Sequence, residues 1–318
     1  MIFLLIKFRR TGLIVGIVSM LLVVCVPGLT KASTVGLILP KDCAFSADIK
    51  DDIAIQLKGL GIKGADVLMQ RPGSDKVSRL NSMRKFLAFG VDVIVVWGAT
   101  SIKEIAAEEG KTPIVFVGVW DPVESGIVKD LKQPGKNITG VVGKTATAFL
   151  LDNIIESTGT KVLGVLYHSG LVDSMAQYGD VKRMAPGKGL ELLEVDLQTT
   201  PEGQASAALE PAPFLYLAQG CDVEGGVYEA LAKLNKPAAT QNPGVSGGGV
   251  IFTLAPDIVE TIKIVSAITG RILKGEKPGN IPVARIKKNN FIINVGEARR
   301  LGVKIPFGVL NRGTEVIR

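Results

Sequence analysis

Short polar segments follow the predicted strands of this chain, and they contain the side chains best suited to bind a small molecule. Hydroxyl and amide groups predominate in them, and several lie beside predicted helix starts, where backbone N–H groups favour an anion. Together they offer donors to a carboxylate and acceptors to an ammonium group, which predicts a site for a small polar or zwitterionic, amino-acid-like solute. The candidate ligand-binding residues are Asp42, Ala99, Thr100, Ser101, Trp120, Asp121, His168, Ser169, Gln219, Asp222 and Gln241.

Asp121 has a structural interpretation as well as a functional one. It precedes Pro122 and stands three residues before Glu124, which is the pattern of a capping box. We therefore expect a helix from Pro122 to about Leu131, capped by Asp121, after a buried strand at 114–119. The N–H groups of this helix start could bind a ligand even if the carboxylate serves as the cap.

Four other candidates also allow a structural role. Ser101 stands three residues before Glu104 at a predicted helix start, so it and Thr100 could cap that helix instead of binding a solute. Trp120 could stack on a ligand or fill the edge of the sheet, and His168 could be an ordinary loop or core residue. The sequence alone leaves both interpretations open for each of them.

Two patterns typical of enzymes occur in the wrong structural context. Residues 59–64 match G-x-G-x-x-G, but they connect a predicted helix to a strand, whereas a dinucleotide site needs a strand followed by a helix. Residues 244–248 match G-x-S-x-G, but they lead into a strand, and the one histidine of the chain, His168, precedes them. We therefore predict no catalytic residue, no metal site and no cofactor, and we do not expect an enzyme.

Strands and helices alternate along the chain in two successive series. This alternation predicts an α/β fold with two doubly wound parallel-sheet lobes and a ligand cleft between them. Parallel strands end at the same edge of their sheet, so the polar segments that follow them should converge there. The predicted strands are 35–39, 65–69, 92–97 and 114–119, followed by 162–167, 190–197, 214–218, 250–254 and 291–295.

The first 32 residues have the pattern of a secretory signal peptide. Basic Lys7, Arg9 and Arg10 precede an uncharged apolar run from Gly12 to Val26, and a small residue stands before the expected cleavage site. We therefore expect export to the periplasm or the exterior. A retained membrane anchor is the alternative, although the apolar run is slightly short for a span.

The three cysteines give no evidence of a metal or redox site. A lipoprotein cleavage before Cys25 would need a small residue at position 24, where the chain has valine. Cys43 and Cys221 belong to no C-x-x-C pair. They are either two unpaired thiols or, since export permits disulfides, a bond between the two halves of the chain.

The charge balance argues against a nucleic-acid partner. The leader carries four basic residues and no acid, so its removal reduces the net charge from +7 to +3. Aromatic residues make up only 5% of the chain, and no basic stripe interleaved with aromatics occurs.

Three segments carry a resemblance to a known family. VFVGVWDPVESGIVKDLKQPGKNITGV, at 115–141, resembles a segment of the extracytoplasmic substrate-binding proteins of ABC transporters, of the tryptophan/tyrosine-binding type. Residues 272–283 and 291–317 resemble the closing part of the same family. The resemblance implies a type I periplasmic-binding-protein-like fold and a monomer that delivers a small solute to an ABC permease.

The resemblance also implies lobe limits and binding loops. Since the chain crosses between lobes more than once in this family, the first lobe would comprise 33–141 and about 255–285, and the second 142–254 and about 286–318. Thr100, Asp121, Ser169 and Asp222 would lie in binding loops. The loop after the first strand and the segment 252–265 depart from the family pattern, so the resemblance does not assign an aromatic amino acid as the ligand.

Two other functions fit a two-lobed α/β chain with a hydrophobic leader. One is a membrane-anchored, glycosyltransferase-like enzyme, which would need a retained leader and a catalytic pair in the cleft. The other is a sensory ectodomain that passes its ligand signal to a partner protein.

Overall fold

The computed structural model describes residues 32–41, 48–220, 233–245 and 247–318. Asp42, Cys43, Cys221 and Asp222 lie outside these ranges, as does the expected signal peptide except for its last residue. Across the described ranges, no helix has both the length and the apolar character that a membrane crossing requires.

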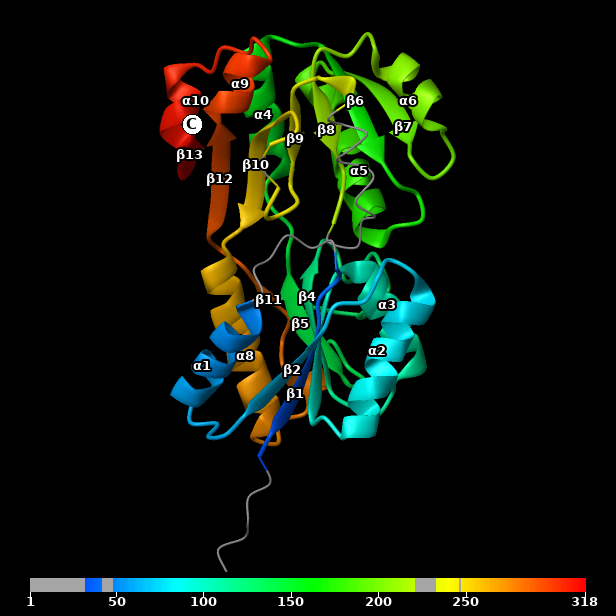
Figure 1. Ribbon diagram of the computed structural model, residues 1–318, viewed down its shortest axis with the longest axis vertical. Coiled ribbons are helices and arrows are strands. Elements are labelled where there is room, and N and C mark those ends of the chain that lie inside the picture. Colours follow the sequence, from blue (N-terminus) through cyan, green and yellow to red (C-terminus); the bar gives the residue numbers. More distant parts are fainter. Residues whose placement is uncertain (1–31, 42–47, 221–232, 246) are drawn as a thin grey trace, which may run out of the picture. The chain divides into compact units, whose positions relative to one another are not determined.

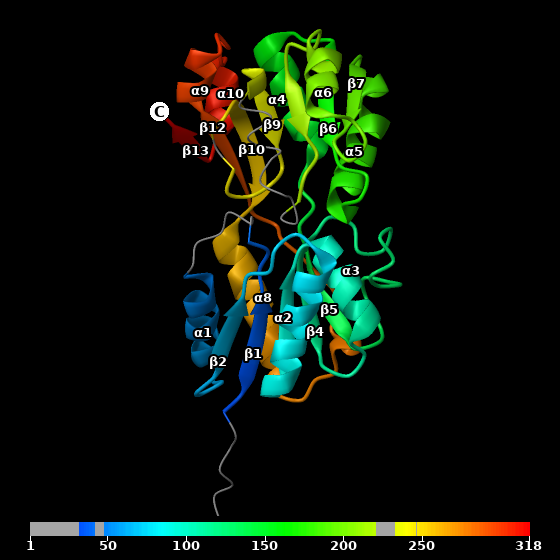
Figure 2. The same ribbon diagram turned by 45° about the vertical axis from the view of Figure 1, so that its right-hand side comes forward.

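Six parallel strands form the first sheet, in the order β11-β5-β4-β3-β1-β2. Four helices cover its two faces, α1 and α8 on one and α2 and α3 on the other (Figures 1 and 2). The strands are β1 (Thr34–Ile38), β2 (Asp66–Gln70), β3 (Val93–Trp97), β4 (Ile114–Val119), β5 (Ile138–Val142) and β11 (Ala284–Arg285), and the helices are α1 (Ile49–Gly59), α2 (Lys76–Phe89), α3 (Ala99–Glu108) and α8 (Ile258–Leu273). We call this unit the first lobe.

The second sheet has seven strands, in the order β13-β12-β10-β9-β8-β6-β7. All neighbours in it are parallel except β10 and β12, which run antiparallel. The strands are β6 (Val162–Tyr167), β7 (Glu191–Asp196), β8 (Leu215–Leu217), β9 (Ala238–Thr240), β10 (Val250–Pro256), β12 (Asn289–Asn294) and β13 (Glu315–Ile317), and the helices are α4 (Thr147–Thr158), α5 (Val172–Met184), α6 (Glu202–Leu209), α9 (Val295–Arg300) and α10 (Phe307–Arg312). We call this unit the second lobe.

Apolar side chains on both faces of each sheet explain why helices must cover both sides. In β3, Val93, Val95 and Trp97 pack with α1 and α8, whereas Ile94 and Val96 pack with α2 and α3. Successive side chains of a strand point to opposite faces, so a continuous apolar run is buried twice.

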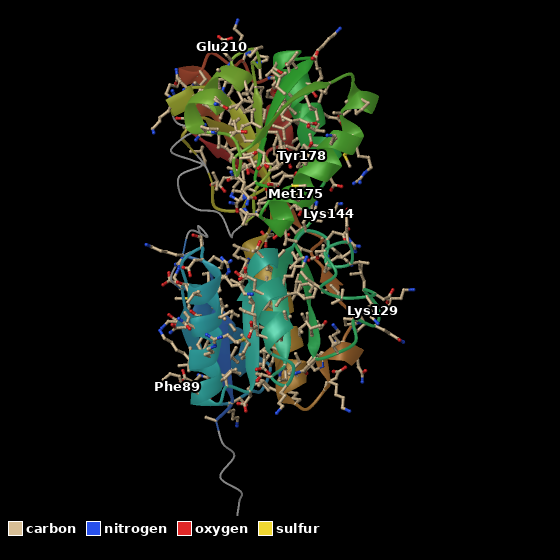
Figure 3. The ribbon with its side chains drawn as sticks, turned by 90° about the vertical axis from the view of Figure 1, so that its right-hand side faces the viewer. Phe89, Lys129, Lys144, Met175, Tyr178 and Glu210 are labelled. Carbon is tan, nitrogen blue, oxygen red and sulfur yellow. The ribbon has the colours of Figure 1, made fainter. Side chains whose placement is uncertain are left out.

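The described chain passes between the lobes at three places. Residues 143–146 join β5 to α4, Asp257 joins β10 to α8, and residues 286–288 join β11 to β12. Lys144 lies at the level of this junction (Figure 3). The residue limits that the sequence suggested for the lobes stay a prediction.

Two expected helix caps are wrong. Residues 122–126 form turns and 127–131 are irregular, so no helix forms; Gly126 takes a left-handed φ of 72° that interrupts the helical path. Asp121 accepts hydrogen bonds from the backbone N–H groups of Val123 and Glu124 and so caps a turn. Ser101 is buried inside α3, which begins two residues earlier, at Ala99.

Candidate functional site

A small pocket of about 40 Å³ lies where the strand ends of the two lobes meet. This volume is well below the range of roughly 300–1,000 Å³ that is usual for small-molecule sites. None of the described residues that line it carries a charged side chain. They are Trp97, Gly98, Gly118, Trp120 and Gly143, which end or follow strands of the first lobe; Gln219, Gly220, Gln241, Pro243 and Pro256, which end or follow strands of the second; and Gln177, Ile258, Thr261 and Ile286.

Gln219 has the most unusual side chain of the pocket. It is 1% exposed, yet neither its Nε2 nor its Oε1 has a hydrogen-bond partner within the part of the chain that the structure describes. Leaving a buried polar group unpaired costs about 1–3 kcal/mol. A solute that accepts a hydrogen bond from Nε2 and donates one to Oε1 would remove this cost.

Gln177, on α5, holds the main chain of Gln219 in place. Its Nε2 donates to the carbonyl oxygen of Gln219 at 2.8 Å, and its Oε1 accepts from the Gln219 N–H at 3.0 Å. The two glutamines therefore differ in role, because the side chain of Gln177 is hydrogen-bonded to the main chain, whereas that of Gln219 has no partner among the described residues.

Glycines bring the main chain of the first lobe up to the pocket. Gly98 and Gly118 line it and adopt positive φ angles of 88° and 75°. A Cβ atom at position 118 would lie 3.2 Å from Nε1 of Trp97. Without side chains at these positions, the main chain itself forms this part of the pocket wall. The N–H of Gly98 already donates to the carbonyl oxygen of Val117 at 3.1 Å, and its carbonyl oxygen accepts from the N–H of Ile102 at 3.1 Å.

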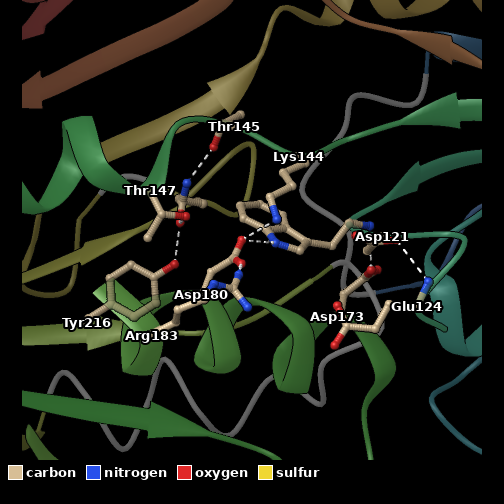
Figure 4. A network of polar contacts seen from close by, with 11 residues as sticks. Asp121, Glu124, Lys144, Thr145, Thr147, Asp173, Asp180, Arg183 and Tyr216 are labelled. Atoms are coloured by element: carbon tan, nitrogen blue, oxygen red, sulfur yellow. Dashed lines mark hydrogen bonds and ion pairs between the residues drawn. The ribbon is translucent and has the colours of Figure 1, made fainter. Parts of the chain in front are cut away.

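The backbone donors at the start of α3 and after β4 bind a carboxylate from the second lobe, that of Asp173. Figure 4 shows Asp173 close to Asp121, in the segment that follows β4. The N–H of Ala99 donates to Oδ2 of Asp173 at 3.0 Å, and the N–H of Trp120 donates to Oδ1 at 2.8 Å. The N–H of Val172 also donates to Oγ1 of Thr100 at 3.2 Å. These bonds join the lobes directly, and we call this arrangement the closed form. The anion that the sequence suggested for this helix start is thus supplied by the protein itself.

The indole of Trp120 is anchored to the second lobe by the buried carboxylate of Asp180, which pairs with two cations that are more exposed. Its Nε1–H donates to Oδ2 of Asp180 at 2.9 Å, and Lys144 contacts the same carboxylate at 2.6 Å. Arg183 binds the other carboxylate oxygen. Burial, with a smaller contribution from the nearby Asp180 carboxylate, raises the pKa of Tyr216 well above its ordinary value.

Gln241 lines the pocket, but its polar atoms are used inside the protein. Its Nε2 donates to Oγ1 of Thr145 at 2.6 Å, in the segment that crosses between the lobes. Its Oε1 accepts from Oγ1 of Thr147 at 3.2 Å and from the hydroxyl of Tyr216. We infer that it fixes the crossing segment and forms part of the pocket wall.

His168 and Ser169 follow β6 but are not among the residues that line the pocket. The N–H of Gly170 donates to Nδ1 of His168 at 3.2 Å, and the N–H of Ser169 donates to Asp196 at 3.0 Å. Burial raises the pKa of Asp196, but hydrogen bonds from Ser169 and Gln198 lower it, and the net pKa lies below the ordinary value.

The structure therefore brings together only part of the predicted set. Trp120, Gln219 and Gln241 line the pocket, and Ala99 contributes its backbone N–H to the contact between the lobes. The other described candidates do not line the pocket; they are Thr100, Ser101, Asp121, His168 and Ser169. In the described ranges, no group of three or more His, Cys, Asp or Glu side chains could hold a metal ion.

Sequence reasoning missed the contribution of α5. Asp173, Gln177 and Asp180 are spaced four and three residues apart, so they lie on one face of the helix. All three are at least 96% buried. Polar residues at the spacing of a buried helix face are the signal that could have identified them.

Comparison with known proteins identifies relatives along most of the chain. The model of the ABC transporter substrate binding protein family matches residues 46–317. A protein named tyrosine-binding protein, from Clostridioides difficile (strain R20291), is 24% identical over 261 residues, which are 78% of this chain and 74% of that protein.

Two solved structures are similar over 90% of this chain and 100% of their own. A conserved domain protein from Vibrio cholerae O1 biovar El Tor has a TM-score of 0.79 at 24% identity. An ABC domain in complex with L-Trp, from Streptococcus pneumonia, has a TM-score of 0.78 at 21% identity. These similarities confirm the expected two-lobed α/β fold.

Proposed function

The chain belongs to the family of ABC transporter substrate binding proteins, as segment 115–141 suggested, and we propose that it captures a small, polar, amino-acid-like solute between its lobes. Proteins of this family bind small solutes and work with a membrane transporter outside the cytoplasm. The observation that carries the proposal is the buried amide of Gln219, which has no partner among the described residues and belongs to the lining of a pocket built by strand ends of both lobes.

In the proposed mechanism, the solute stabilises the closed form because it contacts both lobes at once. In the first lobe it would meet the two tryptophans and the main chain of Gly98 and Gly118. In the second lobe it would hydrogen-bond the amide of Gln219. A ligand shifts an equilibrium only by its differential affinity for the two states, and these joint contacts exist only when the lobes are together.

The chemistry of the pocket supports an amino-acid-like solute. Uncharged donors and acceptors in an otherwise apolar and glycine-lined pocket suit a solute with a polar side chain, and the aromatic walls suit a solute whose side chain is flat. The relative from Clostridioides difficile is named a tyrosine-binding protein, and the similar ABC domain was crystallised with L-Trp. A phenol hydroxyl both donates and accepts, so it could pair with both polar atoms of Gln219.

The proposal includes export, a monomeric state and a partner permease. Residues 1–32 would direct the chain across the membrane and be removed, so that the mature protein meets its solute outside the cytoplasm. The permease would recognise the closed form of the two lobes. No chemical step is proposed, and the relatives, which are solute-binding proteins, give no support to a glycosyltransferase-like function.

Tryptophan fluorescence tests this proposal directly. The chain contains two tryptophans, Trp97 and Trp120, and both line the pocket, so all tryptophan emission reports on the proposed site. Titration with a panel of amino acids and related metabolites should give a saturable change in emission for at least one non-fluorescent solute. For tyrosine and tryptophan, which fluoresce themselves, a rise in melting temperature replaces that measurement. If no solute of the panel changed the tryptophan emission or raised the melting temperature, the proposal would be contradicted.

A further inference from the structure

One buried carboxylate accepts two of the hydrogen bonds that join the lobes. Asp173 stands in the first turn of α5, in the second lobe, and is 4% exposed. Each of its two oxygens accepts one backbone N–H of the first lobe, from Ala99 at 3.0 Å and from Trp120 at 2.8 Å. Figure 4 shows Asp173 close to Asp121, in the segment of the first lobe that follows β4.

These two N–H groups are suited to a carboxylate of any origin. Ala99 begins a helix of ten residues, so its N–H is one of the donors that helix geometry leaves unpaired. Trp120 directly follows β4, and its N–H converges on the same side chain. Hydrogen bonds from neutral donors to a carboxylate are stronger than those between neutral groups, and burial increases their electrostatic part.

Asp173 also lies directly behind the pocket wall. Gly220 lines the pocket, and a Cβ atom at that position would lie 2.9 Å from Cβ of Asp173. Gly98, which precedes one of the two donors, lines the pocket as well. The carboxylate therefore occupies the position next to the pocket where these backbone donors would otherwise be open to a bound anion.

We propose that Asp173 is a specificity-determining residue, whose carboxylate closes the lobes and denies a solute carboxylate access to the N–H groups of Ala99 and Trp120. This inference rests on the proposed function, since it concerns how the same pocket selects its solute. The solute is selected at its uncharged polar end, through Gln219, and any carboxylate that it carries is bound elsewhere in the pocket.

The test removes the carboxylate and then supplies it from solution. Asp173→Ala lacks only the carboxylate group, so formate is the matching small molecule. Small-angle X-ray scattering of the mature chain measures the radius of gyration, with and without a saturating solute. We expect the variant to be more expanded than the wild type, to bind solute about ten-fold or more weakly, and to recover compactness and affinity when formate is added. Formate should leave the wild type unchanged.

Asp196→Ala is the matched control. Asp196 also accepts backbone N–H groups, from Ser169 and Gln198 at 3.0 Å each, but both belong to its own lobe. This variant should keep the compactness of the wild type and should not respond to formate. Asp173→Asn, which keeps the shape but turns an amide N–H towards one donor, should fall between the wild type and Asp173→Ala, and serves if the alanine variant fails to fold.

Each result decides for or against the proposal. An Asp173→Ala chain that is as compact as the wild type, or that folds and ignores formate, overturns it. If no solute of the panel binds the wild type, the proposed function fails, but compactness and the response to formate still decide the role of Asp173.

Discussion

Replacing Gln219 by methionine should weaken solute binding without weakening the fold. The variant keeps the length of the side chain and removes both polar atoms. Two hydrogen bonds to the solute are lost, worth about 0.5–1.5 kcal/mol each, so the dissociation constant should rise roughly 5- to 150-fold. The unfolding free energy without solute should stay unchanged or rise by up to about 3 kcal/mol, because a buried, unpaired amide has been removed.

Gln177→Met is the matched control, since it makes the same chemical change on the same pocket. Here the side chain pairs with the N–H and C=O of Gln219, so the variant leaves two buried backbone groups unpaired. At about 1–3 kcal/mol for each group, the unfolding free energy should fall by roughly 2–6 kcal/mol.

Urea unfolding and calorimetric titration measure the two quantities separately. The structure predicts opposite stability changes for the two variants, with reduced affinity for Gln219→Met. If Gln219→Met lost stability and kept its affinity, Gln219 would be a structural residue, and the argument from its unpaired amide would fail.

Three further predictions concern a helix start, the tryptophan anchor and the leader. Burial raises the pKa of Asp257, but hydrogen bonds at the start of α8 and from Lys288 lower it, and the net pKa lies below the ordinary value. The stabilising effect of Asp257 should therefore be complete above the ordinary carboxyl pKa and be lost as the pH falls through the lowered value. Asp257→Asn should therefore reduce the unfolding free energy by about 1 kcal/mol at neutral pH, and urea unfolding below about pH 4 should find a smaller difference; an equal difference at both pH values would contradict this. Trp120→Phe should lower the unfolding free energy by about 1–3 kcal/mol, because Asp180 loses a buried donor; unchanged urea unfolding would show that this bond contributes nothing. The intact mass of the exported protein should lack residues 1–32, and a mass that includes them would favour a retained anchor.

Local patterns predicted most of the fold. The strand 162–167 coincides with β6, and Asp257 caps α8 by accepting the N–H of Glu260 at 2.8 Å. Short strands with few residues, such as β9 and β13, gave too little periodicity to detect. The helix expected at 122–131 failed because its capping pattern was satisfied by a single turn, while Gly126 took a left-handed conformation.

The site was predictable only where it follows from the ends of strands. That argument placed Trp120, Gln219 and Gln241 at the pocket. It could not identify Asp173, because its two donors lie 74 and 53 residues away along the chain, in the other lobe. Contacts between lobes depend on how the two units approach one another, and hydrophobic periodicity within either unit holds no information on that.

A crystal structure of the mature protein with a solute from the panel would test the central claim most directly. We predict a solute enclosed between the strand ends of the two lobes, with polar atoms within hydrogen-bond distance of Nε2 and Oε1 of Gln219. A solute bound on the outer surface, or an empty pocket at saturating concentration, would contradict the account.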